Sequence, residues 1–258
     1  MKKTWYAMVS MFLLLTFALS GCGKSATSAQ GSGSKMTSAV TSSTAHVSDR
    51  SMDTTYTIQS AEISQGKIKI LYPQLSGMTD TEKQTAINAI IKKDIYDKTV
   101  GADLAYSPLD QINYDVKYQV TLENTRILSV FYTGYSEIES APHPNAVAIG
   151  TTVDLKLSKI VGLPDLVTVD TAFAEKVLAD PDMTYLGLTK RDATLNDALN
   201  QSVELGGPSS IIDTTSAFYL TPDSLVISIS IPHAIGDYAL AYLSGPYAAR
   251  YAAGSTSD

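Results

Sequence analysis

Apolar and polar positions follow two different periods along this chain, and each period predicts a different element. In TDTEKQTAINAIIKKDIYDK, apolar residues recur at spacings of three and four, which predicts a helix over about residues 80–97 with Thr79 or Thr81 as its cap. From Tyr114 to Glu123 apolar and polar residues instead alternate one by one, as in a half-buried strand.

Further elements follow from the same two patterns and from turn residues. Asn124 and Thr125 predict a turn after the first strand. Other strands are expected at 126–135, at 146–155 and on both sides of the Pro222–Asp223 turn, and helices at 168–179 and, after Asp192, at 193–205. Hairpins mixed with helices predict an α+β fold: an antiparallel sheet with helices packed on one face.

The first 22 residues read as a targeting segment. Lys2 and Lys3 precede an apolar run from Ala7 to Leu19, and LSGC follows. This order is typical of a secretory signal peptide, and the run is short for a membrane span. LSGC resembles the bacterial lipobox, which implies cleavage after residue 21 and acylation, with palmitate or a similar chain, at Cys22. Cys22 is the only cysteine of the chain, and thioether lipidation would account for a lone thiol on a secreted protein.

The chain then divides by composition into a spacer, a folded region and a tail. Residues 22–51 are rich in Ser, Thr, Gly and Ala, so we expect a lipidated, disordered linker after a signal peptide at 1–21. Residues 52–252 form the predicted α+β domain, with halves at about 52–160 and 161–252 that we expect to share one core. Residues 253–258 are expected to be a disordered tail.

Charge and missing motifs restrict the function. Removing residues 1–21 takes the formal net charge from −7 to −9 because it deletes two lysines and no acid. This balance argues against a nucleic-acid partner and is compatible with a cationic one. The chain has no H-E-x-x-H, G-x-S-x-G, phosphate-loop or dinucleotide motif. We therefore expect no enzyme activity, no cofactor and no metal, although paired carboxylates that act on a glycan would leave no local motif.

Short motifs follow one another in a set order through both halves of the domain. Their residues are His143, Pro144, Asn145, Asp154, Leu155, Leu163, Asp165, Leu166, Phe218, Leu220, Thr221, Asp223, Leu225, Tyr238 and Ala239. Over roughly residues 54–245 this order resembles the ectodomain of the RsiV-type anti-sigma factors, a module that also precedes some peptidoglycan deacetylases. Pro142 and the LKLSKIVGL turn depart from the family pattern.

The loop SAPHPNA places His143 between two prolines. Pro144 biases His143 toward extended geometry, so its ring could shape the loop, contact a partner or take part in chemistry. Fifteen tyrosines offer apolar area with a polar tip, although alternating tyrosines also line sheets. The candidate binding residues are Tyr132, Tyr135, His143, Asn145 and Tyr238, with no catalytic or metal-ligating residue.

The family resemblance implies lysozyme as a ligand. We expect a lipid-anchored module on the outer face of the cytoplasmic membrane, in a Gram-positive bacterium, that binds lysozyme or peptidoglycan as a sensor, decoy or inhibitor. With no cytoplasmic segment and no deacetylase domain expected after cleavage, only the docking module would remain. The alternatives are a cell-wall glycan enzyme that uses unrecognised carboxylates, and a structural or assembly lipoprotein.

Overall fold

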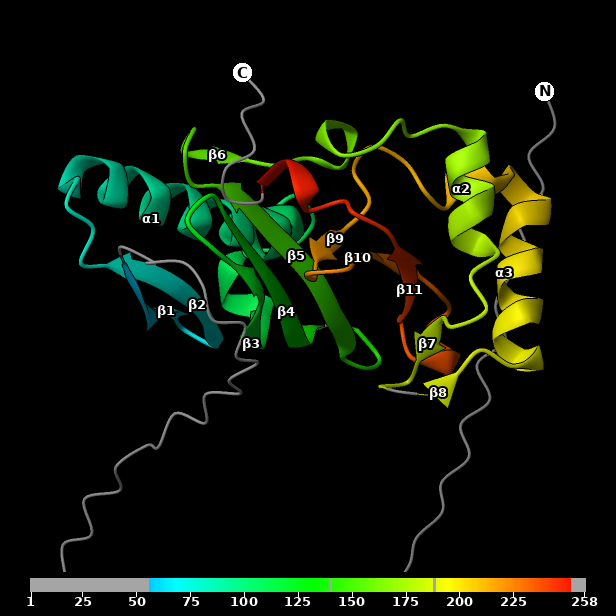
Figure 1. Cartoon of the computed structure of the whole chain (residues 1–258). Coiled ribbons are helices and arrows are strands. Elements are labelled where there is room, and N and C mark those ends of the chain that lie inside the picture. Colours follow the sequence, from blue (N-terminus) through cyan, green and yellow to red (C-terminus); the bar gives the residue numbers. More distant parts are fainter. Residues whose placement is uncertain (1–55, 140, 188, 252–258) are drawn as a thin grey trace, which may run out of the picture. The chain divides into compact units, whose positions relative to one another are not determined.

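A computed structural model describes residues 56–139, 141–187 and 189–251, which form two sheets with helices (Figure 1). The first sheet has the strand order β1-β2-β3-β4-β5-β6. All its pairs are antiparallel except β2 with β3, which α1 connects as a parallel pair. Its strands are β1 (Thr57–Gln65), β2 (Ile68–Ser76), β3 (Ile112–Glu123), β4 (Ile127–Ile138), β5 (Asn145–Asp154) and β6 (Lys159–Ile160).

The second sheet is built from residues after β6 and has the order β8-β7-β11-β10-β9, with antiparallel pairs throughout. Its strands are β7 (Thr184–Tyr185), β8 (Thr189–Lys190), β9 (Phe218–Leu220), β10 (Ser224–Ser230) and β11 (Tyr238–Ser244). The helices of the described ranges are α1 (Thr81–Tyr96), α2 (Thr171–Leu178) and α3 (Ala193–Gly206), with short helices η1 (Asp97–Gly101), η2 (Leu109–Gln111), η3 (Leu163–Asp165), η4 (Pro208–Ser210), η5 (His233–Ile235) and η6 (Ala249–Tyr251).

Helix α1 forms where the periodicity predicts it, and its apolar stripe packs on the first sheet. Ile87, Ile91 and Ile95 are fully buried in the core of that sheet. The cap is Asp80, whose side chain accepts a hydrogen bond from the Lys83 amide at 2.9 Å, so the expectation of a threonine cap is wrong. An N-cap carboxylate both accepts an orphan amide proton and complements the positive end of the helix dipole.

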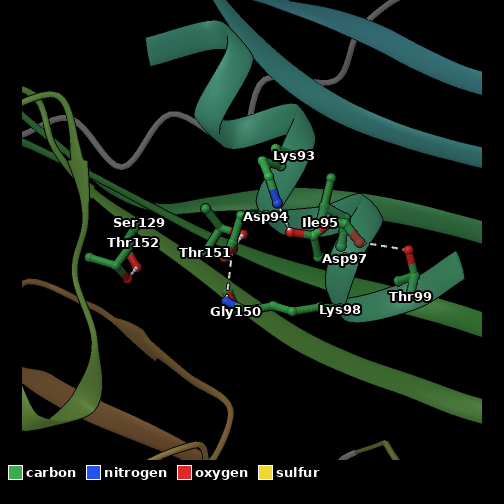
Figure 2. A network of polar contacts seen from close by, with 10 residues as sticks. All are labelled: Lys93, Asp94, Ile95, Asp97, Lys98, Thr99, Ser129, Gly150, Thr151 and Thr152. Atoms are coloured by element: carbon green, nitrogen blue, oxygen red, sulfur yellow. Dashed lines mark hydrogen bonds and ion pairs between the residues drawn. The ribbon is translucent and has the colours of Figure 1, made fainter. Parts of the chain in front are cut away.

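A polar network fastens the end of α1 to β5 (Figure 2). The Asp94 carboxylate accepts a hydrogen bond from the Thr151 hydroxyl at 2.6 Å and pairs with the Lys98 ammonium at 2.7 Å. Lys98 also donates to the Gly150 carbonyl at 2.8 Å. The Asp94 side chain is 13% exposed, so these charge-assisted bonds are partly shielded from water and hold β5 at one position beneath the helix.

Helices α2 and α3 cover one face of the second sheet, as the predictions for 168–179 and 193–205 require. Each begins after an aspartate cap, Asp170 for α2 and Asp192 for α3. Phe173, Val177, Leu195 and Leu199 pack with the β10 side chains Leu225, Ile227 and Ile229 in a second hydrophobic cluster. The α+β class is confirmed, but the strands form two sheets where the sequence predicted one.

The two sheets meet where β9 crosses β5. A Cβ atom at Gly150 would lie 1.7 Å from the Phe218 carbonyl oxygen, so only glycine permits this approach. The Leu220 amide donates to the Ser129 hydroxyl of β4 at 2.8 Å. The Ser129 hydroxyl also bonds the Thr152 hydroxyl at 2.8 Å (Figure 2). The absence of a side chain at Gly150 therefore decides where the second sheet packs on the first.

Candidate functional site

The two histidines of the folded region lie face to face although 90 positions separate them. His143 in the β4–β5 loop stacks on His233 of η5 with ring centroids 3.4 Å apart and an interplanar angle of 7°. Sequence reasoning treated the two histidines as unrelated because their spacing matches no local motif. The stack joins a loop of the first sheet to a turn of the second.

Asp237 completes this contact and connects it to β5. One carboxylate oxygen, Oδ1, lies 2.8 Å from Nδ1 of His233, and Oδ2 accepts the Ala146 amide proton at 2.7 Å. Asp237 has a φ of +70°, after Gly236 at +112°. Aspartate is among the few residues that tolerate this left-handed region. We call His143, His233 and Asp237 the histidine clasp.

A cavity of about 360 Å³ opens beside the clasp and shares Asp237 with it. It lies between β5, the 211–217 segment, the end of β10 and the start of β11. The space exists because Ala146 and Ala148 of β5 carry only methyl groups, and Ser228 and Ser230 of β10 are almost as short. A volume of this size lies at the small end of the range for ligand pockets.

Two carboxylates make the cavity acidic. Asp237 lines it, and so does Asp213, whose Oδ1 accepts hydrogen bonds from the hydroxyl and the amide of Thr215, each at 2.7 Å. These bonds, that from the hydroxyl first, lower the pKa of Asp213, so its carboxylate stays ionised at neutral pH. The cavity can therefore attract a cationic group or accept hydrogen bonds from a polar ligand.

Four of the five predicted binding residues gather at this end of the molecule. Tyr238 lines the cavity. Tyr135 pairs across β4 and β5 with Ala146, another lining residue, and is 64% exposed. Asn145 begins β5 and is exposed, as is His143. Burial first, and then the nearby Tyr135 and Tyr242, raise the pKa of Tyr238, which keeps its phenol neutral and available as a hydrogen-bond donor.

Tyr132 is the fifth predicted residue, and its assignment to a binding surface is wrong. Its side chain is fully buried in the core beneath α1, and burial raises the pKa of its phenol. Successive residues of a strand point to opposite faces, so Tyr132 and Tyr135, three positions apart, cannot share one. The two-residue period of a strand is therefore enough to place these two tyrosines on opposite faces of the sheet.

Sequence reasoning missed His233, Asp237 and Asp213. A weak signal exists, since His143 and His233 each follow a proline in a loop between strands, and Gly236–Asp237 is a turn pair. Neither signal says that the loops meet. Among the described residues, no hydroxyl group that could act as a nucleophile hydrogen-bonds the His233 ring. In the same ranges, no three His, Cys, Asp or Glu side chains are arranged to hold a metal ion.

Several predictions concern other parts of the chain. The signal peptide at 1–21, Cys22 with the 22–51 linker, and the 253–258 tail lie outside the described residues. Among the helices of the described ranges, none is long and apolar enough to cross a membrane.

Comparison with known proteins yields structural neighbours only. No family model matches the chain, and no curated protein does. Eight solved chains match, among them DUF3298 family proteins. A member from Bacteroides fragilis is 13% identical with a TM-score of 0.47, covering 76% of this chain and 92% of its own. A DUF3298 protein from Pseudomonas aeruginosa is 11% identical with a TM-score of 0.41, covering 75% and 92% respectively.

Proposed function

We propose that this chain is a lipid-anchored binding module of the RsiV-ectodomain type, on the outer face of the cytoplasmic membrane of a Gram-positive bacterium. Its ligand is associated with the cell wall, and lysozyme is the first candidate. The observation that carries the proposal is the gathering of exposed His143, Asn145 and Tyr135 around an acidic cavity.

Charge supports a basic protein as the partner. The chain from Cys22 onward carries a formal charge of −9, and Asp213 and Asp237 concentrate negative charge at the cavity. Complementary charges speed diffusional encounter and fix the orientation of the partners, and their effect weakens with salt. A basic enzyme such as lysozyme meets this requirement, whereas a neutral glycan strand does not use it.

The aromatic side chains supply the second requirement of an interface. Tyrosine contributes a large apolar area and a polar tip at a small entropic cost, and it is enriched at binding hot spots. Tyr135 is exposed beside the cavity, and Tyr238 lies partly buried within its lining. The anchor at Cys22 and the 22–51 linker would tether the domain near the wall.

Calorimetry with lysozyme tests the proposal, using residues 49–258, which hold every described element in one compact unit. We expect binding that weakens from low to physiological salt, and a loss of roughly tenfold or more in affinity for Tyr135→Ala. The matched control is Tyr106→Ala, which removes an 88% exposed tyrosine in the turn between η1 and η2 and should leave affinity unchanged. Absence of heat at both salt concentrations would reject lysozyme as the ligand.

A glycan-acting enzyme is the second candidate, because Asp213 and Asp237 line one cavity. Two carboxylates that flank a glycosidic bond can act as acid and base. Turnover of purified peptidoglycan fragments that disappears in both Asp213→Asn and Asp237→Asn would favour this function. Binding without turnover would reject it.

A further inference from the structure

We infer that the histidine clasp is a proton-operated latch, closed when it holds no proton or one and open when both histidines are protonated. Opening frees the His143 loop at the rim of the cavity, so acidification should weaken ligand binding there. The consequence for the ligand rests on the proposed function. The latch itself rests on the geometry of three side chains.

In the closed state the clasp has one negative charge for two basic rings. Asp237 bonds His233 at 2.8 Å, and His143 reaches the clasp only through its 3.4 Å stack on His233. A first proton is well accommodated, because it makes a charge-assisted bond to Asp237 and leaves a cation stacked on a neutral ring.

A second proton changes the sign of the interaction. It places two imidazolium rings face to face at van der Waals distance, and the single carboxylate can offset only one of them. The repulsion is relieved when His143 swings away. Pro142, His143 and Pro144 are all exposed, so the loop can move without opening either hydrophobic core.

Other ionisable side chains near the clasp are Asp213, Tyr238 and Glu139. Asp213 lines the same cavity, and its lowered pKa keeps it ionised. Tyr238, which Tyr135 approaches from β4, has a raised pKa and stays neutral. Glu139, at the start of the loop, is paired with Lys67 at 3.7 Å. Histidine is the side chain that ordinarily changes charge between about pH 5 and 8, so the clasp is the element that responds.

NMR of residues 49–258 tests the latch directly, since His143 and His233 are the only histidines in that range. Between pH 8 and pH 5 we expect the Cε1 protons of both rings to titrate in coupled steps and to lose the ring-current shift of the stack. The amides of 141–146 should change together with the second step. Independent single-site curves, with unchanged loop amides, would overturn the inference.

Two variants separate the latch from ordinary histidine titration. In Asp237→Asn the His233 ring loses the carboxylate that favours its protonated form, so both rings should be protonated, and the loop should open, only at lower pH than in the parent chain. Asparagine also tolerates the positive φ, which limits any loss of structure. In His143→Gln the remaining ring should follow a single-site curve and the pH response of the loop amides should vanish. A parent-like response in either variant would contradict the latch.

Binding provides the second readout and distinguishes the two proposals. If lysozyme binds, its affinity should fall roughly tenfold from pH 7 to pH 5.5 in the parent, a typical size for coupled equilibria, and less than threefold in His143→Gln. Equal falls in both would reject the link between latch and site. If lysozyme does not bind at all, the proposed ligand fails while the NMR experiment still decides the latch.

Discussion

The two faces of β4 and β5 differ in burial and in the size of their side chains, although alternate residues of the same two strands build both. The face toward α1 carries the buried Tyr132 and the Asp94–Thr151–Lys98 network. The face toward the second sheet carries Gly150, the methyl groups of Ala146 and Ala148, and the exposed Tyr135. One face stabilises the fold, and the other leaves room for a cavity.

On these two strands the small residues decide the packing as much as the large residues do. Buried isoleucines and tyrosines fill the α1 face, so it has one packing arrangement. On the opposite face glycine and alanine allow a second sheet to approach at one point and leave space beside it. A site placed on such a rigid sheet gains precise positioning from the core behind it.

Gly150→Val should have the largest effect, because it removes the contact between the sheets. Its Cβ would meet the Phe218 carbonyl at 1.7 Å, and backbone cannot move aside cheaply. We expect a loss of more than about 4 kcal/mol in the free energy of unfolding, measured in urea. Gly66→Ala is the control, because a Cβ atom at this position meets nothing within 4 Å. The positive φ of residue 66 should lower the free energy of unfolding of this variant by only about 1 kcal/mol. Similar losses for the two variants would show that the sheets can separate freely.

Tyr132→Ala and Tyr135→Ala compare the two faces within one strand. Emptying the fully buried site of Tyr132 should cost about 3–5 kcal/mol through lost burial and a cavity. Tyr135→Ala should stay within about 0.5 kcal/mol, because that side chain is 64% exposed, while it weakens ligand binding. Tyr132→Phe keeps the ring and removes a buried hydroxyl that has no hydrogen-bond partner among the described residues, so the free energy of unfolding should stay unchanged or rise. Thermal unfolding measures all three, and an equal cost at 132 and 135 would contradict the assignment of faces.

Asp213→Asn should have the smallest effect, and the effect should depend on pH. The pKa of Asp213 is lower in the folded state, so ionisation stabilises the fold above the unfolded pKa of about 3.9 and this contribution disappears as pH falls further. The parent should be slightly more stable than the variant at pH 7 and should lose that advantage toward pH 3. Because Asp213 is exposed, solvent screening keeps the difference small. A stability gap that is constant between pH 7 and pH 3 would exclude the carboxylate as its source.

Periodicity in the sequence predicted the helices and strands that bury one regular face against a neighbouring element. Ile87, Ile91 and Ile95 predicted α1, and strict alternation predicted β3 and the strand around Ile227. The pair β1 and β2 was missed, since Pro73 within β2 is atypical of a strand. Short β7 and β8 leave too few residues for any period to show.

Local period and loop composition were enough to predict the α+β class, the main helices and strands, and four of the residues that surround the cavity. The division into two sheets, the burial of Tyr132 and the contact of His143 with His233 and Asp237 arise instead from packing between distant segments. Pairing between distant segments depends on how close two backbones can approach. At Gly150 and Phe218 that is a property of the packed chain, which no single segment encodes.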